Sequence, residues 1–257
     1  MSKLKNKVAI VTGGASGIGE AIVREFGAEG AQVISADVTD VAAQQIVDEV
    51  CAAGGDAVFT HTDVSKVRDI QALIADTLER FGRLDVFVAN AGIQIEKTLT
   101  ETTEDEFDRL MSVNQRGAFF CCKHAVEAML ENGEAGGSIV VMGSALSHVA
   151  EPELAAYCTA KGGLHMLVKS IACDYGDKNI RANCICPGYI NTPLCDAYFE
   201  TQPDPAAARQ EAGAMHCLNR MGTTSEVAKC AVFLAGDDSS FVTGSSLVVD
   251  GGLIAKV

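Results

Sequence analysis

The sequence predicts an α/β fold, a doubly wound parallel sheet of about seven strands with helices on both faces. Short apolar runs alternate with segments of helical periodicity along all 257 residues. The apolar runs are continuous rather than alternating, which is typical of strands covered by helices on both faces. No linker, repeat or low-complexity tract divides the sequence. We therefore expect residues 1–257 to form a single domain.

Each expected strand is an apolar run rich in β-forming residues, and the first of them, VAIVT, stops at a pair of glycines. The strands are expected at residues 8–12, 32–37, 57–60, 84–89, 138–142, 180–186 and 247–250. Between them, apolar residues recur at helical spacing. This spacing predicts helices at residues 18–26, 41–50, 67–81, 104–113, 115–130, 154–175 and 225–234.

One stretch, residues 187–213, has neither pattern and contains Pro193, Pro203 and Pro205. We expect it to be irregular. A long loop inside a compact domain usually has a function. Residues 191–213 are therefore expected to form a lid over a substrate.

Composition excludes several classes of protein. Twenty basic against 34 acidic residues give a net charge of −14, which repels nucleic acid and anionic lipid. No apolar run is long enough to span a bilayer, and the run after Lys7 is too short for a signal peptide. The ten cysteines show neither C-x-x-C nor zinc-site spacing. We expect no metal site, mostly buried thiols, and a reducing cytoplasmic location.

A glycine-rich turn, TGGASGIG at residues 12–19, joins the first strand to the first helix. Glycines allow the backbone to approach a pyrophosphate, and the helix N-terminus offers free N–H groups. Asp37 ends the second strand about 20 residues later, where a carboxylate can accept hydrogen bonds from the adenosine ribose of NAD. It would repel the 2′-phosphate of NADP, and its neighbours supply no cation. The turn and Asp37 together favour NAD.

A candidate catalytic group follows the fourth and fifth strands. Tyr157 and Lys161 are four residues apart, on one face of a helix. A nearby ammonium lowers the pKa of a phenol, and reaching pH 7 requires about three units, roughly 4 kcal/mol. Alone, Y-x-x-x-K is common by chance. Ser144 ends strand five, residues 90–92 follow strand four, and Asn114 interrupts a helical region, where its amide can hold a water. All lie where open α/β sheets bind ligands.

With these motifs, the sequence resembles the short-chain dehydrogenase/reductase family over essentially its whole length. The matching positions are TGGASGIG at 12–19, Asp63-Val64, NAG at 90–92, Asn114, Ser144, Tyr157, Lys161, PGYINT at 187–192 and DGG at 250–252. One departure is Ala89, where many members have a second Asn; it does not touch the catalytic set. The resemblance implies a Rossmann-type fold and an oxidoreductase.

The resemblance also implies roles for individual residues. Tyr157 would be the general acid/base, and Lys161 would bind the nicotinamide ribose and lower the tyrosine pKa. Ser144 would hold the reacting oxygen. Asn114 would anchor a water that links Lys161 to solvent.

The residues expected to bind NAD include an adenine contact, a ribose contact at the end of strand four, and a contact to the nicotinamide amide after strand six. The full set is Gly13, Ser16, Gly17, Ile18, Gly19, Asp37, Asp63, Val64, Asn90, Ala91, Gly92, Tyr157, Lys161, Pro187, Gly188, Ile190 and Thr192.

The substrate pocket is expected to be built by residues that follow strands four, five and six. These are Gln94, Ser144, Leu146, His148, Leu154 and Tyr189. Gln94 and His148 are strongly polar, which suggests a second polar group on the substrate. Glu151 and Glu153 lie in the same loop as His148 and are expected on the solvated surface.

The preferred hypothesis is that the protein is an NAD-dependent dehydrogenase acting on a small or medium secondary alcohol or its ketone. Sugar or polyol dehydrogenase and hydroxysteroid dehydrogenase remain open. A 3-oxoacyl-carrier reductase is disfavoured, because such enzymes usually use NADPH and an acidic protein is a poor partner for an acidic carrier. A non-catalytic NAD-sensing protein is expected to lack Tyr157 or Lys161, and both are present. The family usually forms homotetramers, and the helices at 115–130 and 154–175 are expected to pair with their symmetry mates.

Overall fold

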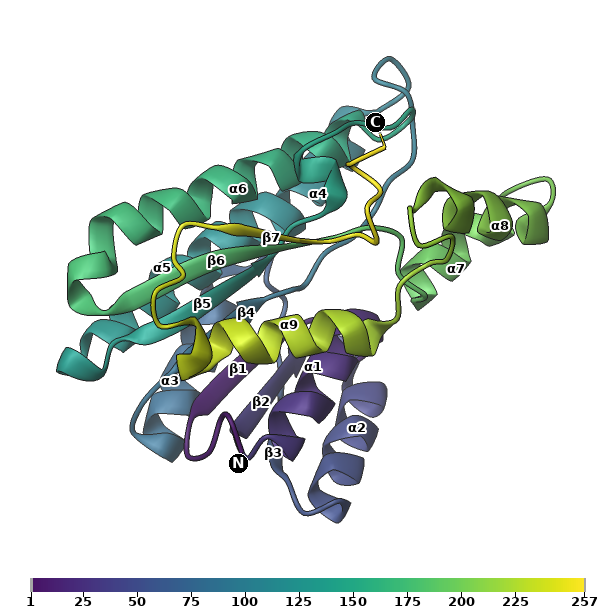
Figure 1. Cartoon of the computed structure of the whole chain (residues 1–257). Helices are drawn as coiled ribbons and strands as arrows, with labels where there is room; N and C mark the ends of the chain where they lie inside the picture. Colours follow the sequence, from purple (N-terminus) through teal and green to yellow (C-terminus); the bar gives the residue numbers. More distant parts are fainter. Residues whose placement is uncertain (1, 257) are drawn as a thin grey trace.

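The centre of the molecule is a parallel sheet with the strand order β3-β2-β1-β4-β5-β6-β7, seen in a computed structural model that describes residues 2–256 (Figure 1). The strands are β1 (Val8–Thr12), β2 (Gln32–Asp37), β3 (Asp56–His61), β4 (Val86–Ala89), β5 (Gly137–Met142), β6 (Ile180–Pro187) and β7 (Ser246–Val249). Strand β1 lies inside the sheet, and its Ile10 is opposite Ile34 of β2 and Phe87 of β4. The strand order reverses between β1 and β4, and a ligand crevice is expected at that point.

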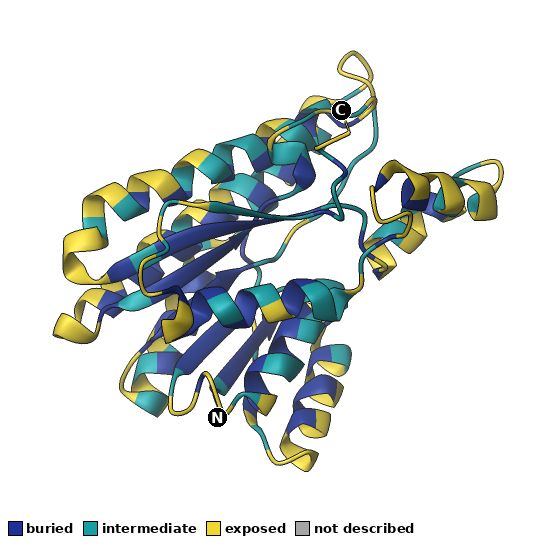
Figure 2. Cartoon of the chain, in the orientation of Figure 1, coloured by how far each residue is buried: buried dark blue, intermediate teal, exposed yellow. Residues whose placement is uncertain are grey.

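Helices cover both faces of the sheet. One face carries α1 (Gly17–Ala28), α2 (Asp40–Ala52) and α9 (Thr224–Ala235), and the other carries α3 (Val67–Phe81), α5 (Ala118–Leu130) and α6 (Ala155–Tyr175) (Figure 1). Each layer buries its own apolar cluster against the sheet, whose inner strands are dark blue in Figure 2. The predicted fold class is therefore confirmed. No helix within residues 2–256 combines the length and apolarity needed to cross a membrane.

A π-helical turn, Ser112–Gly117, separates α4 (Glu104–Met111) from α5. Helix α4 starts with a capping box in which the Thr103 side chain accepts a hydrogen bond from the Glu106 N–H, and the Glu106 carboxylate accepts one from the Thr103 N–H. The sequence predicted two helices here with a break near Asn114. The break is present, and Asn114 lies within the π-helical turn. Such turns interrupt the regular hydrogen-bond ladder and are frequent at functional sites.

The expectation that residues 187–213 are irregular is wrong. Two helices, α7 (Pro193–Glu200) and α8 (Pro205–Met215), occupy most of this stretch and lie beside the carboxyl ends of the strands (Figure 1). Each begins with a proline, whose missing N–H costs nothing at the first position of a helix. The Thr192 hydroxyl accepts from the Cys195 N–H at 3.3 Å, and the Asp204 carboxylate caps α8. The prolines that suggested a loop therefore start helices.

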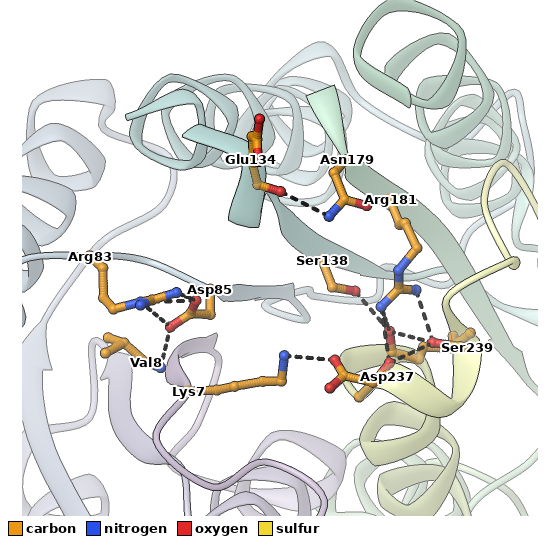
Figure 3. A network of polar contacts seen from close by, with 12 residues as sticks. Lys7, Val8, Arg83, Asp85, Glu134, Ser138, Asn179, Arg181, Asp237 and Ser239 are labelled. Atoms are coloured by element: carbon orange, nitrogen blue, oxygen red, sulfur yellow. Dashed lines mark hydrogen bonds and ion pairs between the residues drawn. The ribbon is translucent and has the colours of Figure 1, made fainter. Parts of the chain in front are cut away.

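The amino-terminal edge of the sheet is closed by polar contacts (Figure 3). Arg83 pairs with Asp85, whose carboxylate also accepts from the Val8 N–H at 2.9 Å. Arg181, on β6, donates hydrogen bonds to the chain that follows α9. The ten cysteines are all free thiols, and four of them are buried, fewer than expected. The carboxyl edge is the one that remains open for a site.

Candidate functional site

A cavity of about 700 Å³ lies at the carboxyl edge of the sheet. It runs from the glycine-rich turn after β1 and the end of β2 to the loops after β4, β5 and β6, and helix α7 contributes to its wall. This is the crevice predicted from the reversal of strand order.

The glycine-rich turn packs too closely against its neighbours to accept larger residues. Gly13 has φ 68°, and a Cβ there would lie 2.9 Å from the Cα of Ala91. A Cβ on Gly19 would lie 1.9 Å from the carbonyl oxygen of Gly13. The turn leads into the N-terminus of α1, where backbone N–H groups are free to bind an anion. The turn is thus a backbone cradle suited to a pyrophosphate.

Asp37, at the end of β2, is one of the cavity-lining carboxylates. One of its oxygens accepts from the Ala15 N–H at 3.0 Å and the other from the Thr39 N–H at 2.9 Å. Asp37 therefore braces the glycine-rich turn while facing the cavity. Asp63 accepts hydrogen bonds from the Ser65 hydroxyl and N–H, which hold its pKa below the usual range against the effect of burial.

Ser144, Tyr157 and Lys161 meet in the middle of the cavity. Ser144 follows β5 and accepts from the Leu146 N–H at 3.1 Å through its hydroxyl. Lys161 is 4% exposed, donates to the carbonyl of Met142 at 2.8 Å, and has its Nζ 5.6 Å from the centre of the Tyr157 ring. The Ser147 hydroxyl donates to the carbonyl of Lys161 at 2.9 Å, which fixes the loop after β5 to helix α6.

Burial dominates the pKa values of this group. It raises the pKa of Tyr157, and the hydrogen bond with Ser144 acts in the opposite direction. It lowers the pKa of Lys161 to about 8. From the sequence, the Lys161 ammonium is expected to lower the pKa of Tyr157. In this structure the net direction for Tyr157 is upward, because burial outweighs the opposing hydrogen bond and the ammonium is directed to Met142.

The Asn114 side-chain amide makes two hydrogen bonds with the backbone of Ile93. Its Oδ1 accepts from the Ile93 N–H at 2.8 Å, and its Nδ2 donates to the Ile93 carbonyl at 2.8 Å. Asn114 is buried and does not line the cavity. The amide instead fixes the segment that follows Asn90-Ala91-Gly92.

Most of the predicted site residues line one cavity. They are Gly13, Ser16, Gly17, Ile18, Asp37, Asp63, Val64, Asn90, Ala91, Gly92, Gln94, Ser144, Leu146, Leu154, Tyr157, Lys161, Pro187, Gly188, Tyr189, Ile190 and Thr192. Gly19 lies behind the turn.

His148, predicted as a substrate contact, does not line the cavity. The short helical turn Ala145–Ser147 precedes it, and its ring packs edge-on against His165 of α6 with the ring centres 5.1 Å apart.

Sequence reasoning missed an acidic group in the cavity wall. Glu96, Glu151 and Glu153 line the cavity. Glu153 is also exposed to solvent, as expected, whereas Glu151 is half-buried. Tyr198 of α7 also lines it. The Tyr189 hydroxyl donates to Glu151 at 2.7 Å across the gap between two loops. Their position after strands four and five was the available signal, but the direction of loop side chains could not be inferred from it.

Comparisons with known proteins agree with this arrangement. The family described as "Enoyl-(Acyl carrier protein) reductase" matches residues 13–254. A 2,5-dichloro-2,5-cyclohexadiene-1,4-diol dehydrogenase of Sphingobium indicum is 39% identical, with 99% of this chain and 100% of that protein covered. A cyclohexanol dehydrogenase of an Acinetobacter species is 36% identical, with 99% and 98% covered. A solved short-chain type dehydrogenase/reductase from Mycobacterium marinum superimposes with a TM-score of 0.92 at 30% identity, with 98% and 96% covered.

Proposed function

Because the chain belongs to the short-chain dehydrogenase/reductase family of oxidoreductases, we propose that it oxidises secondary alcohols, or reduces their ketones, with NAD as its cofactor. The observation that supports this most directly is one cavity in which Ser144, Tyr157 and Lys161 lie beside the glycine-rich turn. Two relatives bear the names of cyclic alcohol substrates, a cyclohexanol and a cyclohexadiene diol. We propose a cyclic or branched secondary alcohol of similar size for this chain.

The residues present fit a nicotinamide dinucleotide, the cofactor type that this family uses. The glycine cradle and the N-terminus of α1 suit the pyrophosphate. Asp37 favours NAD over NADP, since its carboxylate would repel a 2′-phosphate. Among the described residues lining the cavity, Lys161 is the one lysine or arginine. Asp63 and Val64 would hold the adenine, and Ile190 and Thr192 the nicotinamide amide.

The protein's own groups then handle the substrate oxygen and its proton. NAD, when bound, supplies the hydride chemistry. The Ser144 hydroxyl binds the substrate oxygen, and the Tyr157 hydroxyl takes the alcohol proton during oxidation or gives it during reduction. Lys161 would hold the nicotinamide ribose, and its charge there would favour the tyrosinate. Asn114 acts as a positioning residue through Ile93, and it would anchor the water that links Lys161 to solvent.

We propose that residues 191–213, with helices α7 and α8, close over the substrate as a lid within a single functional domain, residues 1–257. Leu194 and Tyr198 of α7 line the cavity, and Phe199 of the same helix is fully buried. The segment packs on the body through a small apolar cluster of its own. It can therefore move as a unit and exclude water from the reaction.

We also propose that the protein assembles as a homotetramer through α5 and α6. Phe119 on α5 and Met166 on α6 are large apolar side chains that are 50% and 58% exposed. Pairing each helix with its symmetry mate would cover them. Sedimentation at micromolar concentration is expected to show tetramers, and monomers alone would contradict the proposal.

A panel of secondary alcohols assayed with NAD⁺ and NADP⁺, followed at the absorbance of the reduced cofactor, tests the proposed function. We expect turnover with a kcat/KM that favours NAD⁺. The double variant Asp37→Ser, Val38→Arg should shift the preference toward NADP⁺, because Val38 is 56% exposed and an arginine there can reach a 2′-phosphate. Cofactor binding without turnover on any alcohol, sugar, polyol or steroid would instead indicate an NAD-sensing protein.

A further inference from the structure

The substrate end of the cavity has a negatively charged wall. Glu96 comes from the segment after β4, and Glu151 and Glu153 from the segment after β5. These carboxylates line the same cavity as Ser144 and Tyr157. Asp37 and Asp63 lie at the other end, beyond β2 and β3.

The two segments that supply these glutamates are joined to each other. The Lys97 N–H donates to the Glu153 carbonyl at 2.7 Å, and Lys97 forms a parallel bridge with Leu154. The backbone at Glu153 has φ 63°, a left-handed conformation that is unfavourable for a residue other than glycine. The fold thus holds Glu153 in an unfavourable conformation at the cavity wall.

Contacts within the protein leave the charge of this wall uncompensated. Glu96 accepts from the Gln94 amide at 2.6 Å and Glu151 accepts from the Tyr189 hydroxyl at 2.7 Å, and both donors are neutral. Within residues 2–256, the Glu153 carboxylate forms no hydrogen bond or ion pair.

Lys161, within residues 2–256 the one lysine or arginine that lines the cavity, donates to the Met142 carbonyl. Two basic residues on neighbouring segments pair with other carboxylates. Lys97 pairs with Glu106 at 2.6 Å, and Arg209 pairs with Asp196 at 2.7 Å. Burial and the charge of Glu153 raise the pKa of Glu96, and burial with the charges of the three glutamates raises the pKa of Tyr198. The three carboxylates therefore act on the same small volume.

An ionised carboxylate only accepts hydrogen bonds, so a group that faces this wall must donate them. A carboxylate, sulfonate or phosphate on the substrate would be repelled, because charges a few ångströms apart interact strongly where water is partly excluded. Resting on the proposed function, we propose that Glu96, Glu151 and Glu153 select secondary alcohols that carry a second hydrogen-bond donor, a hydroxyl or an ammonium group, and reject anionic alcohols.

Four compounds of one ring size test this selection: cyclohexanol, trans-1,4-cyclohexanediol, trans-4-aminocyclohexanol and trans-4-hydroxycyclohexanecarboxylate. In the wild-type enzyme we expect kcat/KM to be highest for the diol and the amino alcohol. The carboxylate should be at least about tenfold below the diol, given the expected strength of the repulsion. Calorimetric titration of each compound into the enzyme saturated with NADH measures affinity without turnover, and we expect the affinities to follow the same order.

The triple variant Glu96→Gln, Glu151→Gln, Glu153→Gln keeps the size of each side chain and removes the charge. We expect it to accept the carboxylate nearly as well as the diol, with cyclohexanol changed least. The single variants should each give part of the effect, and they provide the test if the triple variant does not fold. Glu79→Gln, on the exposed face of α3, removes one charge far from the cavity and should leave all four values unchanged.

The outcomes separate this proposal from the proposed function. Absence of turnover on all four compounds and on the wider alcohol panel would overturn the proposed function. The order of the four affinities would still test the role of the three glutamates. Equal affinity for the diol and the carboxylate in the wild type would overturn the wall proposal. A preference that persists unchanged in the triple variant and in every single variant would overturn it as well.

Discussion

Asn90 donates two hydrogen bonds to Thr12, one from its backbone N–H to the Thr12 hydroxyl and one from its side-chain amide to the Thr12 carbonyl, both at 3.0 Å. The same amide donates to the Gly13 carbonyl at 3.2 Å. Asn90 follows β4 and Thr12 ends β1, so these bonds span the point where the strand order reverses. Asn90 therefore holds the glycine-rich turn in the shape that the cofactor is expected to meet.

We expect Asn90→Asp to weaken NADH binding about tenfold, equivalent to ~1.4 kcal/mol. A carboxylate has nearly the same shape but donates no hydrogen bond and repels the two carbonyls of the turn. Fluorescence titration with NADH measures the change.

Asn132→Asp is the matched control. The Asn132 amide also donates to two backbone carbonyls, Leu84 at 2.7 Å and Gly136 at 2.9 Å, but it does not line the cavity. It should lose stability to urea to a similar extent and keep its affinity for NADH. If both variants bind NADH equally well, the turn does not depend on Asn90.

Tyr157→Phe should lower kcat by about 10²–10⁴-fold, the usual contribution of a general acid or base. The change removes one hydroxyl from a half-buried ring, so NADH affinity should stay within a few-fold of the wild type. The wild-type oxidation rate should rise with pH as the tyrosine loses its proton, and the variant should lose that rise. Tyr175→Phe, at the far end of α6, serves as the control with normal kcat. A Tyr157→Phe enzyme with wild-type kcat would assign the proton transfer to another group.

The parts of the fold that local chemistry determines could be predicted from the sequence. Strand β1 is a nearly continuous apolar run, β2 has an apolar centre at Val33-Ile34, and α3 has a regular apolar stripe. Their bounds were predicted correctly. The glycine-rich turn lies next to a strand end, and the Tyr157–Lys161 pair lies on a regular helix face. At such places the position in the sequence alone determines where the side chains point.

The parts that depend on tertiary contacts could not be predicted in this way. His148 and Glu151 lie three residues apart in one loop, yet only Glu151 lines the cavity. A short helical turn directs His148 to α6, and the hydrogen bond from Tyr189 holds Glu151. Neither contact has a sequence signal. The prolines of residues 191–213 were ambiguous for another reason, since proline both ends helices and begins them.

Lys161 should make stability depend on pH in a defined direction. Its pKa is lowered to about 8 in the folded protein from 10.5, so between these values the unfolded chain holds a proton that the folded protein has lost. Stability then rises with pH through this window, by up to roughly 3 kcal/mol in total.

Urea unfolding of the cofactor-free protein from pH 7 to 10, compared with Lys161→Met, measures this linkage. Methionine keeps the length of the side chain without the charge. We expect Lys161→Met to be the more stable protein at pH 7, with the difference narrowing as the pH rises above 8. A difference that stays constant over the range would show that Lys161 is not buried in its charged form.

Arg181 should be a main stabilising residue at the edge of the sheet opposite the cavity (Figure 3). Its guanidinium donates to the carbonyls of Leu234 at 3.0 Å and Gly236 at 3.1 Å, and to the Ser239 hydroxyl at 2.9 Å. These bonds join β6 to the end of α9. Burial lowers the pKa of Arg181, with the charge of Asp237 opposing it.

Arg181→Met fills much of the same space but removes the charged donor. The Leu234 carbonyl keeps its bonds from the Ser138 and Ser239 hydroxyls, and the Gly236 carbonyl keeps its bond from Ser239. We expect it to lower the free energy of unfolding by about 3 kcal/mol, because buried acceptors that lose a charged donor are costly. Arg80→Met, which breaks an exposed pair with Asp76, should cost no more than about 1 kcal/mol. Urea unfolding at one fixed protein concentration compares the two. Since Arg181 does not line the cavity, the KM for alcohol and cofactor should be unchanged in the folded variant. A loss of stability no greater than that of Arg80→Met would mean that the chain after α9 is held by its apolar contacts alone.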